Sequence, residues 1–328
     1  MSRGAAPPMA VPWRIDPDMA EACAVEAARA AALPPAADLA EERRRGIAAA
    51  TFWSEGAPEV RAVEDHVVPG PGSDVPVRLF RGDDRSPAPV LLYVHGGGWA
   101  QGSVAQNEPA IRTLVSRTGW TVAAPSYRLA PEHPYPAGLD DCLAVARWLH
   151  REGRALGLDP SRLALGGASA GANLALATAL ALPRRGLAPA AALVLCYGVF
   201  GADVDTPSYR AFGDGRFGLS RATMARYLDW YDPAGRRDDD PLIQPLLAAP
   251  ADLAALPPTW QVAAGLDVLC SDTLELHRRL VAAGVRVTLR FEPGAVHGFI
   301  NRGRMVRAAR DSLAAAAAFL AALATEAP

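Results

Sequence analysis

The stretch that decides the fold reads Leu163-Ala164-Leu165-Gly166-Gly167-Ala168-Ser169-Ala170-Gly171. It is an apolar run that leads into a Gly-x-Ser-x-Gly turn, and the residues behind it, 170–182, have a helical pattern. A serine on a sharp turn between a strand and a helix needs small neighbours two positions away, which Gly167 and Gly171 supply. Free N–H groups at the start of the helix would face any anion that develops at the serine. The stretch therefore predicts a nucleophilic Ser169 at the end of a buried strand, although this pentapeptide also arises by chance in chains rich in alanine and glycine.

Short apolar runs and helical segments alternate on both sides of this stretch. Apolar runs predict strands at 60–68, 75–81, 89–94, 120–124, 162–165, 191–197, 259–264 and 285–291. Helical patterns lie at 104–118, 139–155, 170–182, 271–283 and 304–323. Such alternation with continuous apolar strands is typical of a mostly parallel sheet that helices cover on both faces. We therefore expect an α/β fold with about eight strands, in which the first two strands could form an antiparallel edge.

Two parts of the chain fall outside this alternation. Residues 16–33 and 36–53 have helical patterns, and Pro34-Pro35 separates them. The segment 198–258 is long and rich in aromatic residues, and it contains a further helical pattern at 220–230. Long excursions from a compact domain usually serve as lids or binding elements. We therefore expect N-terminal cap helices within residues 1–55 and a catalytic domain at 56–328, with a cap or lid insertion at about 199–235.

A run of glycines marks the end of the expected strand at 89–94. His95-Gly96-Gly97-Gly98-Trp99 follows it directly, and three consecutive glycines let the backbone approach a ligand closely. Their N–H groups can converge on an anion, as in the oxyanion hole that HGGG-type loops form in lipases and esterases. A flexible turn is the alternative explanation, but the position upstream of the serine turn favours an oxyanion hole. We expect His95 itself to have a structural role in the loop.

A serine hydroxyl needs a general base, and the chain has six histidines. Only His297 lies in a glycine-flanked loop after the last expected strand; the others are His66, His95, His133, His150 and His277. Hydrolases of this topology order their catalytic residues as serine, acid and histidine along the chain, which His297 satisfies. The acid should follow the penultimate strand, where Asp267 lies, with Asp272 as its competitor. Because Asp272 opens a predicted helix and is expected to cap it, Asp267 is the preferred acid.

Composition excludes several other chemistries. The chain has 328 residues, a net charge of −2 and 50% hydrophobic residues, so it has ample material for a core and no basic stripe for nucleic acid. It contains no lysine, which excludes Schiff bases, pyridoxal-phosphate anchoring and a Walker-type phosphate loop. The four cysteines are scattered without metal-ligand spacing, and no apolar run has the length of a signal peptide or a membrane span. We therefore expect reduced thiols and a cytoplasmic protein.

Together these motifs resemble those of the hormone-sensitive-lipase-like group of α/β-hydrolases, the bacterial family IV esterases. The resemblance covers about residues 90–300 and rests on five landmarks in the expected order: His95–Trp99, Ser126–His133, Gly167–Gly171 with Asn173-Leu174, Asp267–Leu269 and His297–Phe299. Two positions depart from the family pattern, because Ala168 and Ala172 stand where members commonly carry an aspartate and a glycine. Both substitutions are small and leave the serine turn intact, but the missing carboxylate could change the rate or its pH profile.

The resemblance implies an α/β-hydrolase fold with a helical cap and neither a metal nor an organic cofactor. The implied catalytic triad is Ser169, Asp267 and His297, and the implied oxyanion hole consists of the N–H groups of Gly97, Gly98 and Ala170. The stretch 127–133 would support the site, with Arg128 and Glu132 paired in a network.

The expected function is hydrolysis of short- to medium-chain acyl esters through an acyl-enzyme intermediate. An apolar pocket would include Trp99, Phe200, Phe212 and Phe299, although each of these residues could equally belong to the core. An alternative hypothesis is an amidase or N-acetyl deacetylase that acts on a secondary metabolite with the same triad. A third hypothesis, a non-catalytic small-molecule receptor, is disfavoured because the triad is complete. We expect a small ester as the partner, without nucleic acid or stable membrane association, and a homodimer is compatible with the sequence.

Overall fold

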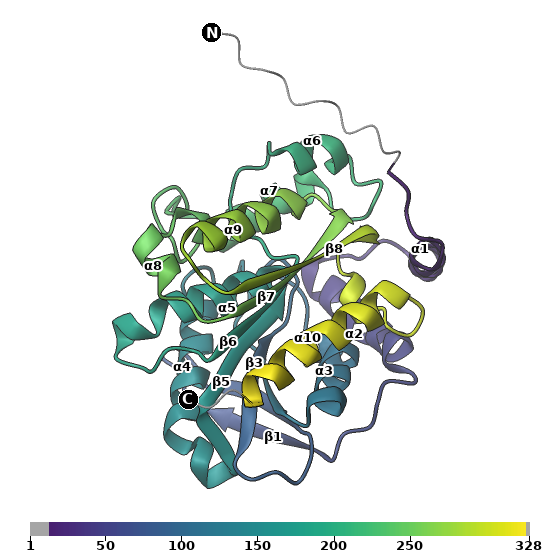
Figure 1. The fold of residues 1–328 in the computed structure, drawn as a ribbon. Helices are drawn as coiled ribbons and strands as arrows, with labels where there is room; N and C mark the ends of the chain where they lie inside the picture. The colour runs from purple at the N-terminus through teal and green to yellow at the C-terminus, as the bar shows by residue number, and fades with distance from the viewer. Residues whose placement is uncertain (1–12, 326–328) are drawn as a thin grey trace.

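An eight-stranded sheet forms the centre of the structure, a computed structural model that describes residues 13–325 (Figure 1). Its strands lie in the order β1-β2-β4-β3-β5-β6-β7-β8. Their bounds are β1 (Ala62–Val68), β2 (Val75–Arg81), β3 (Ala88–Val94), β4 (Thr121–Pro125), β5 (Leu158–Ala168), β6 (Ala192–Cys196), β7 (Thr259–Leu266) and β8 (Val287–Val296). Strand β2 is antiparallel to both of its neighbours, β1 and β4, whereas the other neighbouring strands are parallel. The predicted α/β fold and its antiparallel edge are confirmed.

Helices cover both faces of this sheet. On one face lie α3 (Val104–Thr118) and α10 (Arg307–Thr325), and on the other lie α4 (Ala137–Glu152), α5 (Ala170–Ala181) and α9 (Cys270–Ala282). Every residue of helix α5 is buried, and apart from Asn173 and Thr178 the helix consists of alanine, leucine and glycine. A helix that is apolar all round belongs in a core rather than at a surface. The sheet and α5 therefore form a rigid base for the residue that precedes α5, Ser169.

Two strands extend further than the sequence pattern predicts. Strand β5 begins at Leu158 instead of 162, because Leu158 and Asp159 pair with the start of β3. Strand β8 continues past the expected end at 291 and through Pro293-Gly294 to Val296. Proline and glycine usually end a strand, but the register against β7 shifts between Ala264 and Leu266 and absorbs this irregularity. As a result, β8 ends directly before His297.

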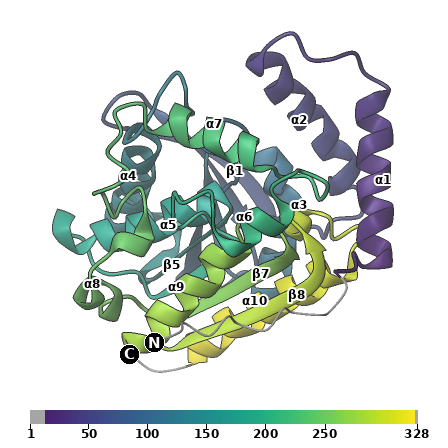
Figure 2. The ribbon, with the colours of Figure 1, turned by 90° about the horizontal axis from the view of Figure 1, so that it is seen from above.

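The two segments that fall outside the alternation of strands and helices, before β1 and between β6 and β7, also contain helices. They contain α1 (Pro17–Ala31), α2 (Leu39–Ser54), α6 (Pro207–Phe212), α7 (Arg221–Tyr231) and α8 (Pro250–Ala254). In Figure 2, α1 and α2 form a layer at one side of the molecule, where α2 packs on α3 and α1 contacts β8. The sequence pattern did not predict α6 and α8, because six and five residues are too few to show a helical period. Residues 1–12 of the expected cap region lie outside the described residues.

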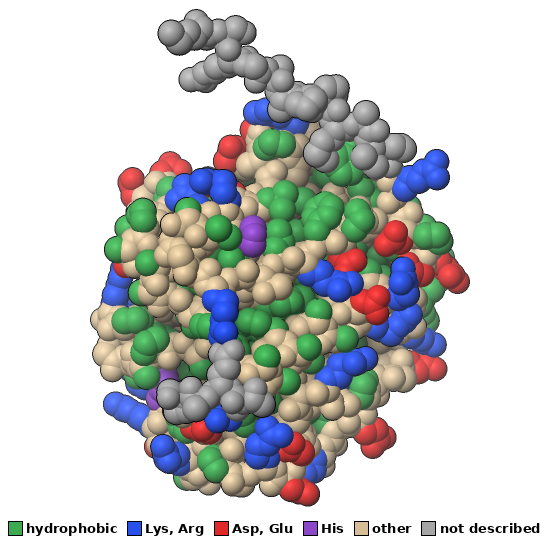
Figure 3. Space-filling model, viewed as in Figure 1, with side chains coloured by type: hydrophobic (Ala, Val, Ile, Leu, Met, Phe, Trp, Pro, Cys, Tyr) green, Lys and Arg blue, Asp and Glu red, His purple; other side chains and the backbone are tan. Residues whose placement is uncertain are grey.

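The surface shows no accumulation of one charge on the face drawn in Figure 3, where arginine and acidic side chains are interspersed. Among the helices of the described chain, none is long and apolar enough to cross a membrane.

The parallel strands bring the predicted catalytic residues to one edge of the sheet. Ser169 follows β5, Asp267 follows β7 and His297 follows β8. Because the carboxyl ends of parallel strands meet at the same edge, three residues that are far apart in sequence become neighbours there.

Candidate active site

Ser169 occupies a strained turn between β5 and α5. Its backbone has φ 57° and ψ −123°, a combination that residues with a side chain rarely adopt. The turn is held by the N–H of Ser169, which donates to the carbonyl of Cys196 at 2.9 Å. A Cβ atom on Gly167 or Gly171 would lie only 2.4 or 2.0 Å from the carbonyl oxygen of Val94 on the neighbouring strand β3. Glycine is therefore required at both positions because the serine turn packs directly against the backbone of β3.

His297 connects this serine to a buried carboxylate. Its Nε2 lies 3.0 Å from Oγ of Ser169, and its Nδ1 lies 2.7 Å from Oδ2 of Asp267. The other carboxylate oxygen of Asp267 accepts the N–H of Leu269 at 3.0 Å. A neutral imidazole satisfies both contacts when Nδ1–H donates to the carboxylate and Nε2 accepts from the hydroxyl. The arrangement can remove a proton from Ser169 while Asp267 holds the imidazole in the required tautomer.

Tyr197 is a neighbour of His297 that the sequence reasoning missed. It follows β6 at the same edge of the sheet and is buried, and its ring meets the imidazole edge-on with centroids 5.0 Å apart. The backbone of Tyr197 has a φ of 37°, which is unusual for a residue with a side chain. The expected strand at 191–197 ended at Tyr197, so its place at the carboxyl end of a buried strand was the available signal.

The glycine loop after β3 presents unused backbone donors beside Ser169. Gly97 and Gly98 have φ values of 127° and 59°, so both positions favour glycine. The carbonyl of Gly97 accepts the N–H of Gln101 at 2.8 Å, which closes the loop into a turn. The N–H groups of Gly97, Gly98 and Ala170 donate to no acceptor within residues 13–325. These are the three donors expected from the family resemblance, and Gly97 and Gly98 line the same cavity as Ser169.

His95 stabilises this loop from inside. The imidazole is buried, its Nδ1 lies 2.9 Å from the carbonyl oxygen of Gly96, and its ring stacks on Tyr127 with centroids 4.3 Å apart. The hydroxyl of Tyr127 donates to the carbonyl of His95 at 3.0 Å. Burial lowers the pKa of His95 to about 4, so the ring is neutral near pH 7. The contacts of His95 are those of the structural role that we expected.

We expected Asp272 to cap helix α9, but its side chain does not do so. Its carboxylate is buried, and one oxygen accepts the N–H groups of Phe200 and Gly201 at 2.9 and 2.8 Å. The reason is that the loop after β6 passes over the start of α9 and leaves its own N–H groups to be satisfied there. Burial raises the pKa of Asp272 to about 7 despite these two hydrogen bonds. Asp272 thus anchors the loop after β6, and the structure places only Asp267 against His297.

Arg128 and Glu132 do not pair with each other, contrary to the expectation. Arg128 binds the buried carboxylate of Asp141 on α4, with 2.7 Å between Nη2 and Oδ1. Glu132 instead accepts two hydrogen bonds from Arg43 of α2, at 2.8 and 2.9 Å. These partners lie 13 and 89 residues away along the chain. The pairing that the resemblance implied is wrong, because the stretch between the two residues directs Arg128 toward α4 and Glu132 toward α2.

A cavity of about 320 Å³ lies in front of Ser169 and His297. Residues of α2 and of the segment 219–227 form much of its apolar wall, among them Trp53, Leu219, Met224 and Tyr227. Other lining residues are polar, such as Glu26 of α1 and Arg302, which form an ion pair with each other. Side chains from α1, α2 and α7 therefore line the cavity together with Ser169 and His297.

The four aromatic residues expected to line the substrate pocket lie elsewhere. Trp99, Phe200, Phe212 and Phe299 are all buried, and none is among the residues that line the cavity beside Ser169. Trp99 stacks on Tyr231 at 4.3 Å and so belongs to the core. The pattern could not distinguish a pocket aromatic from a core aromatic, and Tyr227 and Trp53 take the place of the expected residues.

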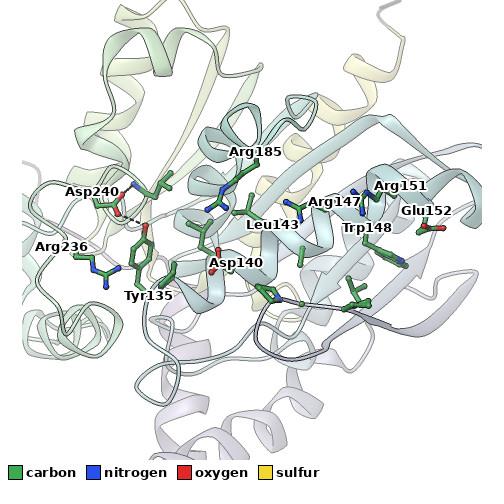
Figure 4. A pocket seen from close by; sticks show the side chains of 18 residues that line it. Tyr135, Asp140, Leu143, Arg147, Trp148, Arg151, Glu152, Arg185, Arg236 and Asp240 are labelled. Carbon is green, nitrogen blue, oxygen red and sulfur yellow. Dashed lines mark hydrogen bonds between the residues drawn. The ribbon is translucent and has the colours of Figure 1, made fainter.

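A second, larger cavity of about 750 Å³ runs along α4 and shares no lining residue with the first (Figure 4). Arg147 and Arg185 project toward it near Asp140, and Tyr135 closes one end with a hydrogen bond of 2.8 Å to Asp240. It holds no serine or histidine, so it lacks the groups for acyl transfer. Within the described part of the chain, no group of three or more His, Cys, Asp or Glu side chains is placed to hold a metal ion.

The fold and this geometry are those of a serine hydrolase built on an α/β sheet, and comparison with known proteins agrees. Residues 91–301 match the family described as alpha/beta hydrolase fold. The chain therefore belongs to the alpha/beta hydrolase fold family. This finding and the relatives below confirm the resemblance to hormone-sensitive-lipase-like esterases.

Similar proteins are named esterases or ester hydrolases. The carboxylesterase NlhH of Mycobacterium tuberculosis is 37% identical over 281 residues, which cover 84% of this chain and 87% of that protein. An ethyl acetate hydrolase of Pseudomonas putida is 35% identical over 309 residues, which cover 91% and 96% of the two chains. The solved structure of an esterase from Pyrobaculum calidifontis superposes with a TM-score of 0.86 at 28% identity, covering 95% of this chain and all of that one.

Proposed function

We propose that the protein is a serine carboxylesterase that hydrolyses short- to medium-chain acyl esters, with Ser169 as nucleophile, His297 as general base and Asp267 as the orienting acid. The observation that carries this proposal is the position of the imidazole, with Nε2 at 3.0 Å from the serine hydroxyl and Nδ1 at 2.7 Å from a buried carboxylate. A serine hydroxyl is a weak nucleophile unless a base lies within hydrogen-bond reach, and here it does.

The reaction would proceed in two acyl-transfer steps. Ser169 attacks the ester carbonyl while His297 accepts its proton, and the free N–H groups of Gly97, Gly98 and Ala170 stabilise the tetrahedral oxyanion. The imidazolium then protonates the departing alcohol, which leaves an acyl group on Ser169. His297 next deprotonates a water molecule that attacks the acyl-enzyme, and the carboxylic acid is released with the serine regenerated.

The size of the cavity and the relatives support small substrates. A volume of about 320 Å³ lies at the lower end of the range of small-molecule pockets. Relatives named for ethyl acetate and for acetyl esters are 35% and 32% identical to this chain. We further propose that α1, α2 and the segment at about 199–235 act as the cap, because α1, α2 and residues 219–227 contribute side chains to the cavity. The four cysteines form no disulfide, which suits the reducing cytoplasm that we propose as the location.

The test is hydrolysis of p-nitrophenyl esters from acetate to decanoate, with a p-nitroanilide in parallel to detect amidase activity. We expect activity to peak at the short chains and to fall by about 10⁴–10⁶-fold in Ser169→Ala. Ser161→Ala, which changes an exposed serine near the start of the same strand β5, is the matched control and should keep full activity. A folded wild-type protein without activity on any of these esters would overturn the proposal, and turnover of the anilide alone would identify an amidase.

A further inference from the structure

Arg43 of α2 reaches from the proposed cap to the loop that carries the oxyanion-hole glycines. Its Nε donates to the carbonyl of Ala100 at 2.8 Å, and its Nη2 donates to the carbonyl of Ala130 at 2.8 Å. The same guanidinium forms a two-pronged ion pair with Glu132, at 2.9 and 2.8 Å. The planar fork of arginine is suited to hold several acceptors in fixed directions at once.

The two carbonyls belong to segments that are bonded to each other beside the oxyanion hole. Ala100 follows Gly97, Gly98 and Trp99 directly, and the N–H of Ala130 donates to the carbonyl of Trp99 at 2.9 Å. One guanidinium therefore clamps both segments at the end of the glycine loop. A neighbouring α2 residue adds a further tie, because Glu42 accepts the side-chain amide of Gln101 at 2.7 Å.

The opposite side of the loop is held by the core instead. Trp99 donates its indole N–H to Asn173 at 3.3 Å, and its ring stacks on Tyr231. These contacts fix the tryptophan side chain, whereas the carbonyl of Ala100 is bound by Arg43. The backbone that leads out of the oxyanion hole is thus supported from the core on one side and from α2 on the other.

We infer that Arg43 is a positioning residue for the oxyanion hole, so that docking of α2 and the catalytic geometry of Gly97 and Gly98 depend on each other. The inference rests on the proposed function, because it assigns Arg43 a role only if those N–H groups stabilise an oxyanion. Arg43 touches neither Ser169 nor the cavity beside it, and it acts through the carbonyls of Ala100 and Ala130. Its effect should therefore be on the transition state and not on substrate binding.

A second arginine provides the matched control. Arg304 ties the other end of α2 to the catalytic domain through the carbonyl of Phe52 at 2.7 Å and the carboxylate of Glu55 at 2.7 Å. It therefore anchors α2 as Arg43 does, but its contacts lie away from the glycine loop. Any effect that comes only from loosening α2 should appear in Arg304→Ala as much as in Arg43→Ala.

The experiment measures kcat and KM for p-nitrophenyl butyrate in the wild type and in Arg43→Ala, Arg43→Lys and Arg304→Ala, with the melting temperature of each. It also measures inhibition by an alkyl trifluoromethyl ketone, which forms a tetrahedral adduct with the serine and places an oxyanion in the hole. In Arg43→Ala we expect kcat to fall about ten- to a hundred-fold, since a shift of about 1 Å in catalytic groups has an effect of this size. KM should stay within about threefold, and the ketone should bind more weakly by the same factor as kcat falls.

The remaining variants separate this role from simple anchoring. Arg304→Ala should keep the wild-type kcat, Arg43→Lys should lie between the wild type and Arg43→Ala, and added guanidinium at millimolar concentration should partly restore Arg43→Ala. Equal losses in Arg43→Ala and Arg304→Ala, or an unchanged ketone affinity, would overturn the inference. The inference would also be overturned if the wild type is active and Arg43→Ala is equally active. A wild type that hydrolyses none of the esters would instead overturn the proposed function. If Arg43→Ala does not fold, the kcat and ketone affinity of Arg43→Lys decide.

Discussion

Replacement of Gly98 by alanine tests whether the glycine loop forms the oxyanion hole. A Cβ atom at this position would lie 2.1 Å from Cδ2 of Tyr227 and 2.5 Å from two further atoms of the same ring. Carbon atoms in contact are ordinarily about 3.5–4.0 Å apart, so the loop and the ring must separate by roughly 1.5 Å. The substitution also places a side chain at φ 59°, where alanine is disfavoured by about 1–2 kcal/mol.

Tyr227 and the glycine loop should both move in Gly98→Ala, and the movement of the loop affects catalysis. Tyr227 is half-buried on α7 and packs against the loop, so part of the displacement falls on the N–H groups of Gly97 and Gly98. Loss of one oxyanion donor typically lowers kcat about 10²–10³-fold, which corresponds to about 2.7–4 kcal/mol. We expect Gly98→Ala to lower kcat within this range while KM for p-nitrophenyl butyrate changes little.

Two further variants separate the collision from the backbone strain. Gly186→Ala introduces a side chain at φ 69° with no atom within 4 Å, so it reproduces the strain at a remote site and should leave kcat unchanged. In a Tyr227→Ala background the obstacle is gone, and Gly98→Ala should then cost at least tenfold less in kcat than in the wild type. The reasoning is refuted if Gly98→Ala keeps kcat within about threefold of wild type, or if it loses as much activity without the Tyr227 ring as with it.

Two more predictions concern the acidic residues behind the site. Asp267→Asn should lower kcat about 10⁴-fold with little change in stability, because an amide no longer selects the tautomer of His297 that accepts the serine proton; a loss below tenfold in steady-state kinetics would argue against this role. In the folded chain the pKa of Asp272 is about 7, above the ordinary value of 3.8, so the folded state holds the proton more tightly than the unfolded state. The stability that this difference contributes is therefore complete below about pH 4 and is lost as the pH rises toward 7. Between these pH values the free energy of unfolding of the wild type should fall with pH by up to about 1.4 kcal/mol per pH unit more than that of Asp272→Asn, as measured by urea denaturation. Parallel plots of this free energy against pH for the two proteins would contradict the assignment.

The amino-acid sequence was sufficient to predict the fold class and to single out Ser169, Asp267 and His297, which the structure brings together. Alternation of apolar strands with helices is written locally along the chain, so it predicted the sheet, its antiparallel edge and most of the helices. Ser169, Asp267 and His297 were identifiable because each follows a strand of a parallel sheet, and parallel strands bring such positions to one edge. Gly167 and Gly171 were recognisable for a related reason, since close approach of two backbones leaves room only for glycine.

The pairing of distant segments and the choice of side chains that face the cavity could be seen only in the folded structure. Asp272 bonds to the loop after β6, and Glu132 binds Arg43 instead of Arg128, because each polar group takes the partner that the packing brings within reach. The burial of Trp99 and the exposure of Tyr227 to the cavity depend in the same way on how α7 lies against the glycine loop. Local sequence contains the preference of each residue for a strand, a helix or a turn, whereas contacts between residues tens of positions apart arise only when the sheet assembles and its helices are packed.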